Sequence, residues 1–354
     1  MKKFILFLFT FLFSIFALGN DLNDNASASQ TQQQVVNVAS FKGVQVTGIT
    51  VSKDGRIFAN APRWRKGVPY SVVEIMPDKT IKPYPNESMN NWEIGNSISN
   101  KFISVQSVVA HDNYLYVLDT ANPMFKGLIA EPRLYVYELN SNKLVKTYTF
   151  PANVVKKNSY TNDLRVDDKL SKIYITDSGA AGLIILDSKT GQFTRILDNH
   201  QYTKAEFDHL TIYGKEWKNT VHSDGIALDS KNDILYIHAL TGYTLYGIKT
   251  SDLLNPKALK KAKPFSIKTS APDGMIIDDN GNLYFGDLEH NKISYLTPDR
   301  KEIKTLVDGD EVKWPDTFSI YNGYLYFSNS RISETGGDIS NLIFTIDKVK
   351  LPTK

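Results

Sequence analysis

One local sequence pattern recurs about six times along this chain, and that repetition constrains the fold more than any other feature. Each copy joins an apolar, β-branched run to a polar turn such as Asp279-Asn280-Gly281 and then to a second run of Tyr, Phe, Ile and Leu. The clearest copies occupy residues 223–238, 272–287 and 315–329, and weaker ones begin at Asn162, Gln106 and Thr47. Asp-Gly and Asn-Gly turns favour tight antiparallel hairpins. Repeats roughly 43 to 61 residues apart are typical of propellers and solenoids.

Further strands follow most copies, as at residues 183–186 and 193–197. Three or four antiparallel strands in each of six repeats predict an all-β fold, a six-bladed β-propeller of four-stranded antiparallel blades. The last repeat supplies only three strands, and residues 35–41 alternate as a strand. Because an unpaired sheet edge invites aggregation, we expect this N-terminal strand to complete the last blade and close the ring. Helical periodicity is almost absent, and a short helix is expected only within residues 253–263.

The N-terminal residues predict export. Lys2 and Lys3 precede an apolar stretch of about fifteen residues, which is shorter than the roughly 20 residues of a transmembrane helix and typical of a secretory signal. We therefore expect residues 1–19 to be a signal peptide, the protein to be secreted or periplasmic, and no stable membrane anchor to remain after cleavage. A retained anchor is the alternative. Residues 20–34, rich in Asn, Asp, Ala, Ser and Gln, are expected to be a disordered spacer, and residues 35–354 a single propeller domain.

The composition excludes several function classes. The chain has no cysteine, so a lipid-anchored bacterial lipoprotein and a disulfide framework are excluded. Its net charge of +3 is nearly balanced and forms no basic block, so we expect no nucleic-acid partner, and we expect a monomer. The six histidines are scattered, without a His-Glu-x-x-His zinc motif, and no Gly-x-Ser-x-Gly elbow of a serine hydrolase occurs.

Oxygen-bearing side chains are predicted to gather at one mouth of the propeller channel. In an antiparallel hairpin, the residue before the first strand and the residue after the second lie at the same face. From these positions we select as ligand-binding candidates Asn162, Asp163, Asp177, Asp224, His238, Asp273, Asp287, Asp316 and Asn329. Crowded carboxylates raise one another's pKa unless a ligand or a cation such as Ca²⁺ offsets their charge. The architectural alternative is that each Asp or Asn accepts hydrogen bonds from backbone amides of its own turn.

Three connections are longer than hairpins need. They span residues 121–132, 199–221 and 330–340, and the first two are rich in apolar and aromatic residues. Because long loops on a rigid scaffold often carry binding sites, we expect these three to wall a pocket at the channel mouth. The alternative is that they only cover sheet edges.

Several motifs resemble the major royal jelly and yellow protein family. They are the segment at residues 52–64, Ser104-Val105-Gln106-Ser107-Val108, Leu118-Asp119-Thr120, Ile175-Thr176-Asp177-Ser178-Gly179, Asp287-Leu288-Glu289-His290-Asn291 and Trp314-Pro315-Asp316-Thr317. In lacking cysteine, the chain resembles the bacterial branch of this family, which is described as dopachrome-tautomerase-related, rather than the disulfide-containing insect members. This resemblance implies a secreted six-bladed propeller that binds a small aromatic or amine-bearing ligand in its channel, with Asn329 in the ligand-binding wall. Some insect members of the family convert dopachrome, which makes tautomerase activity an expectation here.

A second resemblance gives a different function. Asn162, Asp224 and Asp273 resemble the metal-ligating positions of gluconolactonase-type propellers, which implies a metal-dependent hydrolase with a divalent cation such as Ca²⁺. The first-blade glutamate of that family corresponds here to Thr47, so one charged ligand is missing. A non-enzymatic interaction platform is the third hypothesis, because propellers commonly present a flat binding face.

Overall fold

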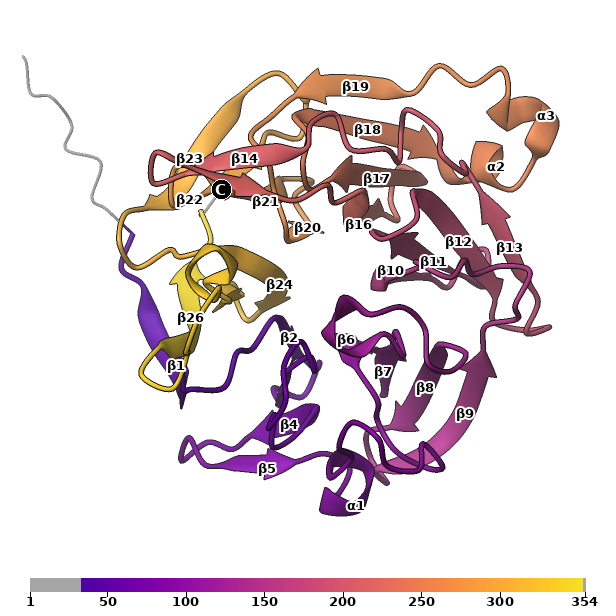
Figure 1. Cartoon of the computed structure of the whole chain (residues 1–354). Helices are drawn as coiled ribbons and strands as arrows, with labels where there is room; N and C mark the ends of the chain where they lie inside the picture. The colour runs from indigo at the N-terminus through magenta and orange to yellow at the C-terminus, as the bar shows by residue number, and fades with distance from the viewer. Residues whose placement is uncertain (1–32, 353–354) are drawn as a thin grey trace, which may run out of the picture. The chain divides into compact units, whose positions relative to one another are not determined.

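The computed structural model describes residues 33–352, which form six four-stranded antiparallel sheets arranged in a ring (Figure 1). Consecutive strands pair within each sheet, and the first strands of the six sheets contact one another around the axis. This arrangement confirms the predicted six-bladed β-propeller. The predicted signal peptide and almost all of the predicted spacer lie outside the described residues.

Each blade is a four-stranded meander. Blade 1 contains β2 (Gly48–Val51), β3 (Ile57–Asn60), β4 (Val72–Ile75) and β5 (Ile81–Pro83). Blade 2 contains β6 (Val105–His111), β7 (Tyr114–Asp119), β8 (Arg133–Glu138) and β9 (Lys143–Thr149). Blade 3 contains β10 (Thr161–Asp167), β11 (Lys172–Asp177), β12 (Gly182–Asp187) and β13 (Phe193–Ile196).

The second half of the ring repeats this plan. Blade 4 contains β16 (Ser223–Asp229), β17 (Ile234–Ala239), β18 (Thr244–Lys249) and β19 (Phe265–Lys268). Blade 5 contains β20 (Met275–Ile277), β21 (Leu283–Asp287), β22 (Lys292–Leu296) and β23 (Ile303–Asp308). Blade 6 contains β24 (Pro315–Tyr321), β25 (Tyr324–Asn329), β26 (Ile343–Lys350) and β1 (Val36–Lys42).

The ring is closed by the N-terminal strand, as the sequence predicted. Strand β1 pairs antiparallel with β26, and Phe41 lies opposite Phe344 with both rings buried. Figure 1 shows the indigo β1 beside the yellow β26. The two ends of the described chain are therefore joined in one sheet, so the ring has no unpaired gap.

Apolar faces of neighbouring blades pack together and form the core. One cluster joins Phe58 and Val72 of blade 1 to Val108 and Val117 of blade 2. Alternation of side chains along each strand gives every blade two faces, and burial of both stabilises the ring by the removal of apolar surface from water. Within residues 33–352, no helix is long and apolar enough to cross a membrane.

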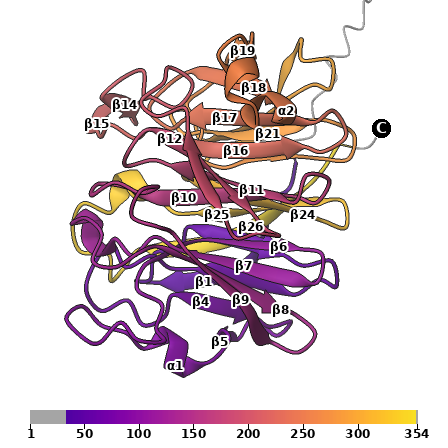
Figure 2. The same cartoon turned by 90° about the vertical axis from the view of Figure 1, so that its right-hand side faces the viewer.

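The structure contains short elements outside the blades. They are the hairpin β14 (His209–Ile212) and β15 (Lys215–Lys218), the helices α1 (Glu87–Asn90), α2 (Thr250–Leu253) and α3 (Pro256–Leu259), and the 3₁₀ turns η1 (Pro123–Phe125) and η2 (Ile332–Glu334). The single helix expected within residues 253–263 is wrong in extent. Asn255 interrupts it by capping α3, and Pro256 begins a new helix because it cannot continue the preceding one. Figure 2 shows the hairpin β14–β15 at the side of the ring opposite the turns that join β24 to β25.

Candidate ligand-binding site

The inner strands begin with bulges that turn polar side chains into the channel. The pairing register breaks between Thr161 and Leu164 in blade 3, between Ser223 and Ile226 in blade 4, and between Pro315 and Phe318 in blade 6. A bulge leaves its residues out of the ladder and re-aims their side chains. The residues in these breaks include Asn162, Asp224 and Asp316, which line one cavity together with Asp273 from the segment before β20.

Two glycines allow the inner strands to converge at this point. A Cβ atom on Gly225 would lie 2.9 Å from the carbonyl oxygen of Asp273, and one on Gly274 would lie 2.6 Å from the carbonyl oxygen of Asp316. Only glycine fits such close backbone approaches. The glycine after Asp224 and the glycine after Asp273 therefore each let the inner strand lie close to that of the next blade. These Asp-Gly pairs are more than turn residues.

The cavity, here called the upper pocket, has a volume of about 530 Å³. It lies within the range of about 300 to 1,000 Å³ that small-molecule sites occupy. All three long connections contribute to its wall: Phe125 from the first, Trp217, Asn219, Thr220 and Val221 from the second, and Ile332, Ser333, Thr335 and Gly336 from the third. The prediction that these connections wall a pocket is confirmed.

Three buried carboxyl groups form the base of the upper pocket. Asp224, Asp273 and Asp316 are 3%, 7% and 6% exposed. Burial raises the pKa of Asp224 well above its usual value, and the charges of Asp273 and Asp316 raise it further. Burial also raises the pKa of Asp273 to about 7, although hydrogen bonds from Trp314 and with Asp224 act in the opposite direction. Burial and the charge of Asp273 raise the pKa of Asp316.

Asn162 and Gln106 continue this polar base. The Asn162 amide nitrogen donates to Asp224 Oδ2 at 2.8 Å and to Ser178 Oγ at 3.0 Å. The Asn162 oxygen accepts from Gln106 Nε2 at 3.3 Å. These contacts orient the amide of Asn162 towards the carboxylate of Asp224, which stabilises the ionised form of that group.

Aromatic side chains form two opposite parts of the wall. Phe125 stacks on Tyr160 with ring centroids 5.1 Å apart and lies 5.3 Å from the Trp64 ring. The Trp64 indole donates to the Tyr160 hydroxyl at 2.5 Å, and that hydroxyl donates to Gln106 at 2.7 Å. Phe125 is 60% exposed, so its ring remains accessible to a ligand.

The second aromatic group, Trp217 and Trp314, holds the carboxyl group of Asp273 in place. Trp217 of the β15 strand meets Trp314 edge to face at 4.8 Å, and the Trp314 indole donates to Asp273 Oδ2 at 2.7 Å. Trp314 adopts a φ of 61°, a left-handed conformation that is uncommon for a bulky residue. Such strain costs on the order of 1 to 3 kcal/mol and tends to occur at functional sites.

The remaining predicted site residues do not line the upper pocket. Asp177 accepts from Ser159 Oγ, Arg195 Nη1 and the backbone amides of Tyr160 and Ala180. His238 is buried between the Ala239 carbonyl and the Thr269 hydroxyl, and burial lowers its pKa to about 4. Asp177 thus has the backbone-amide contacts that the architectural alternative describes, and His238 is held by a carbonyl and a hydroxyl inside the blade.

Asp163, Asp287 and Asn329 are also engaged elsewhere. Asp163 forms an ion pair with Arg165 at 2.8 Å, and Asp287 contacts His290 Nδ1 at 2.7 Å. Asn329 donates to Asp347, Thr345 and the Glu311 carbonyl and accepts from the Lys313 amide, and it lines a separate surface depression. The structure therefore brings together Asn162, Asp224, Asp273 and Asp316, but not the other five.

The residues at the proposed metal positions do not match a lactonase-type cation site. Thr47 is fully buried in place of the first-blade glutamate, and its hydroxyl accepts from Asn60. The Asn162 amide nitrogen, which cannot bind a cation, points to Asp224. Among the described residues, the group of three His, Asp or Glu side chains close enough to share an ion is His111, Asp112 and Asp168, which do not line this pocket. We derive no metal-dependent step from this arrangement.

Sequence reasoning missed Trp64 and Tyr160, which line the pocket, and Trp314, which donates to the pocket residue Asp273. Trp314 directly precedes the Pro315-Asp316 pair, and an indole beside a predicted channel carboxylate is a signal that could have identified it. Tyr160 lies two residues before Asn162 and could have been identified in the same way, whereas Trp64 carries no such signal.

The sequence matches a known family over most of the propeller. Residues 103–342 match the family model described as "Major royal jelly protein". Dopaminechrome tautomerase of Drosophila melanogaster is 27% identical over 250 residues, which cover 64% of this chain and 52% of the relative. Major royal jelly protein 3 of Apis mellifera is 26% identical over 240 residues, which cover 62% of this chain and 43% of the relative. The chain thus spans about half the length of the curated relatives it matches.

Solved structures support the fold alone. A luciferin-regenerating enzyme superposes with a TM-score of 0.56 at 11% identity, covering 90% of this chain and 95% of that one. A virginiamycin B lyase from Staphylococcus aureus superposes with a TM-score of 0.51 at 15% identity, covering 91% and 99%.

Proposed function

Because this chain belongs to the major royal jelly protein family, we propose that its upper pocket binds a small aromatic amine. The observation that carries the proposal is the combination of three buried carboxyl groups with an accessible aromatic wall. An ammonium group placed among Asp224, Asp273 and Asp316 offsets the repulsion that raises their pKa values. The ring of the ligand then packs against Phe125 or Trp217.

Two interactions are expected to contribute moderately to the binding free energy. A charge-assisted hydrogen bond between the ammonium group and a buried carboxylate contributes roughly 1.5 to 3 kcal/mol. An aromatic contact adds about 0.5 to 1.5 kcal/mol beyond the apolar area it buries. The first term needs an ionised carboxylate, whose ionisation the ammonium group itself favours, and the second needs an accessible aromatic ring.

We further propose tautomerase activity in the same pocket, because one relative is a dopaminechrome tautomerase. A tautomerase removes a proton from one atom of its substrate and returns a proton to another, without net oxidation or reduction. Asp224 and Asp273, held close enough that each perturbs the pKa of the other, supply one carboxylate to accept a proton and one carboxylic acid to donate. Such general acid–base catalysis contributes about 10² to 10⁴ in rate.

Calorimetric titration with dopamine tests the binding proposal. We expect one site per chain and an affinity at least about 10-fold weaker in Asp224→Asn, which corresponds to the loss of one charge-assisted contact. Asp287→Asn is the matched control, because Asp287 belongs to the same predicted mouth ring but does not line the pocket. Equal losses in both variants, or none in Asp224→Asn, would overturn the proposal. Conversion of dopaminechrome by the wild-type protein, lost in Asp273→Asn, tests the tautomerase step separately.

The metal-dependent alternative makes a different prediction. A cation present at 100 times its dissociation constant stabilises a folded protein by roughly 2.7 kcal/mol. A melting temperature that rises by several degrees in millimolar Ca²⁺ relative to EDTA, and no longer does so in Asp224→Asn, would favour the hydrolase over the amine-binding protein.

Export forms part of the proposal. It rests on Lys2, Lys3 and the apolar stretch that follows them within residues 1–19. Mass spectrometry of the protein recovered from outside the cytoplasm should show a new N-terminus before residue 35. Recovery of the full-length chain only from the cytoplasm would contradict export.

A further inference from the structure

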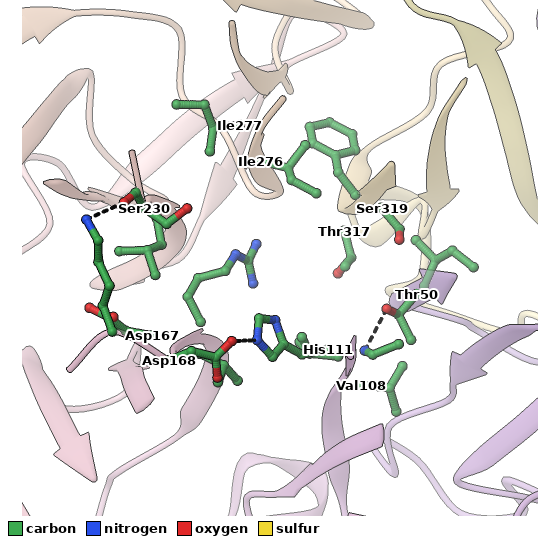
Figure 3. A pocket seen from close by; sticks show the side chains of 18 residues that line it. Thr50, Val108, His111, Asp167, Asp168, Ser230, Ile276, Ile277, Thr317 and Ser319 are labelled. Carbon is green, nitrogen blue, oxygen red and sulfur yellow. Dashed lines mark hydrogen bonds and ion pairs between the residues drawn. The ribbon is translucent and has the colours of Figure 1, made fainter. Parts of the chain in front are cut away.

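A second cavity lies at the opposite mouth of the channel (Figure 3). This lower cavity has a volume of about 490 Å³ and shares no lining residue with the upper pocket. The inner strand of every blade contributes to it, so its walls are parts of the rigid ring rather than surface loops. Its volume lies within the range of about 300 to 1,000 Å³ that small-molecule sites occupy.

Apolar side chains form half of its wall. The partly exposed ones among them include Val109, Val166, Leu228, Ile276 and Ile277, which come from four different blades. Figure 3 shows Ile276 and Thr317 on one side of the cavity and His111 on the other. An apolar ligand body of a few carbon atoms can therefore contact several blades at once.

Arg165 supplies the buried cation of the lower cavity. Its side chain is 14% exposed. Nη1 donates to Asp163 Oδ2 at 2.8 Å and to the Leu164 carbonyl at 2.6 Å, and Nη2 donates to the Met275 carbonyl of blade 5 at 2.6 Å. The guanidinium therefore links blade 3 to blade 5 in a fixed orientation.

The guanidinium keeps unused donor capacity. Arginine has five N–H groups, and the contacts recorded for Arg165 use three of them. Nε–H and one N–H of Nη2 remain, and such guanidinium donors form charge-assisted hydrogen bonds with a carboxylate. Since Arg165 lines the cavity, these donors are the ones a ligand there can use.

The other charged lining residues have partners of their own. His111 contacts Asp168 at 2.6 Å, and Lys169 contacts Asp233 at 2.6 Å. The carboxyl group of Asp167 accepts from the Leu170 amide at 3.1 Å and from the Tyr174 hydroxyl at 3.3 Å. The remaining N–H groups of Arg165 are thus the charged donors that are left to fix the orientation of a ligand.

We propose that the lower cavity is a second binding site, for a small carboxylate with a compact apolar body. The carboxylate binds the two remaining N–H donors of Arg165, and the apolar body packs against Leu228, Ile276 and Ile277, which line the cavity and are only partly buried. This site is distinct from the amine site, because the two cavities share no lining residue.

Titration calorimetry with cyclohexanecarboxylate tests this proposal. We expect one site on the wild-type protein and at least about 10-fold weaker binding by Arg165→Lys, which keeps the positive charge beside Asp163 but loses the two-donor fork. The neutral cyclohexanecarboxamide should bind at least about 10-fold more weakly than the carboxylate. Equal affinity of the acid and the amide, or unchanged affinity in Arg165→Lys, would overturn the proposal.

Arg300→Lys is the matched control. Arg300 is also nearly buried and donates to the Gly281 and Thr297 carbonyls, but it does not line the cavity, so the variant should bind the probe normally.

If Arg165→Lys fails to fold, a crystal structure of the wild-type protein with the probe decides the question: density beside Arg165 supports the site and density elsewhere refutes it. Saturating dopamine should leave probe binding unchanged, and competition between them would place the probe in the upper pocket and refute a second site. Failure of dopamine binding alone leaves the carboxylate result intact, so the two proposals fail separately.

Discussion

Replacement of Asp273 by asparagine is predicted to make the protein more stable at neutral and alkaline pH while it weakens the binding of an amine. Asp273 is buried, and its folded-state pKa is raised from 3.8 to about 7. A carboxyl group whose pKa is raised on folding favours the folded state most below its unfolded pKa, and that stability is lost as the pH rises towards the folded pKa. Between about pH 4 and pH 7, ionisation of Asp273 therefore destabilises the wild-type fold increasingly.

The magnitude follows from the size of this shift. Each pKa unit corresponds to about 1.4 kcal/mol, so a rise from 3.8 to about 7 sets an upper limit of about 4 kcal/mol for the wild-type penalty at pH 8. Asparagine has no charge to bury, and its side-chain oxygen can still accept from the Trp314 indole. We expect Asp273→Asn to gain about 1 to 4 kcal/mol at pH 8 and almost nothing at pH 4.

The assay is the melting temperature of both proteins between pH 4 and pH 8. A change of 1 kcal/mol moves the melting temperature by about 2 °C in a large domain, so the two curves should coincide at pH 4 and separate by roughly 2 to 8 °C at pH 8. Asp177→Asn is the control with the opposite sign. Asp177 is paired with Arg195 at 2.8 Å, and removing one partner of a buried ion pair costs about 3 to 5 kcal/mol.

A constant difference between Asp273→Asn and the wild-type protein across this pH range would refute the reasoning, as would destabilisation at pH 8. Either result would mean that the Asp273 carboxylate is not disfavoured in the folded state. The pocket would then lack the electrostatic reason to recruit an ammonium group.

Three further predictions concern the ring, the wall and the family-derived residue. Deletion of residues 36–42 should lower the melting temperature of the whole domain by more than 10 °C, about 5 kcal/mol or more, because it exposes β26 and removes Phe41 from the core; an unchanged temperature would contradict ring closure by β1. Phe125→Ala should weaken dopamine binding by about 0.5 to 1.5 kcal/mol in calorimetry with no change in stability, since the ring is mostly exposed; normal affinity would exclude it from the ligand wall. Asn329→Ala should cost about 1 to 3 kcal/mol in denaturant unfolding and leave dopamine affinity unaltered, because its amide bonds to Asp347 and Lys313 and does not line the pocket; a selective loss of affinity would restore its expected role.

The fold could be predicted from the sequence because the repeated residues have structural roles that follow from local chemistry. Asp224-Gly225 and Asp273-Gly274 start inner strands, Asp279-Asn280-Gly281 makes a hairpin turn, and the strand at 35–41 has no partner except the incomplete last blade. Local turn chemistry and the need to pair every edge are sufficient to specify these elements. The two short helices around Asn255 were not separated, because a cap and a proline only three residues into a weak helical pattern are easily read as part of one helix.

The site could be predicted only in part, since Asp177 and Asp224 look equivalent in sequence. Both flank a strand at the same mouth, yet Asp177 lies at the end of a second strand and binds its own turn, whereas Asp224 lies in a bulge and faces the channel. The glycine after Asp224 and Asp273 is a local signal for these two residues, because the close approach of the next blade requires it, but Asp316 is followed by Thr317 and lacks this signal. Arg165 is a charged residue in an inner strand, but its reach to Met275 depends on the assembled ring and is not contained in any local pattern.

A crystal structure of the protein with dopamine tests the central claim most directly. We expect the ammonium nitrogen within hydrogen-bonding distance of at least one of Asp224, Asp273 and Asp316, and the ring against Phe125 or Trp217. Dopamine bound at another surface, or an upper pocket without ligand density at a saturating concentration, would contradict the claim that this propeller uses its buried carboxyl groups to bind an aromatic amine.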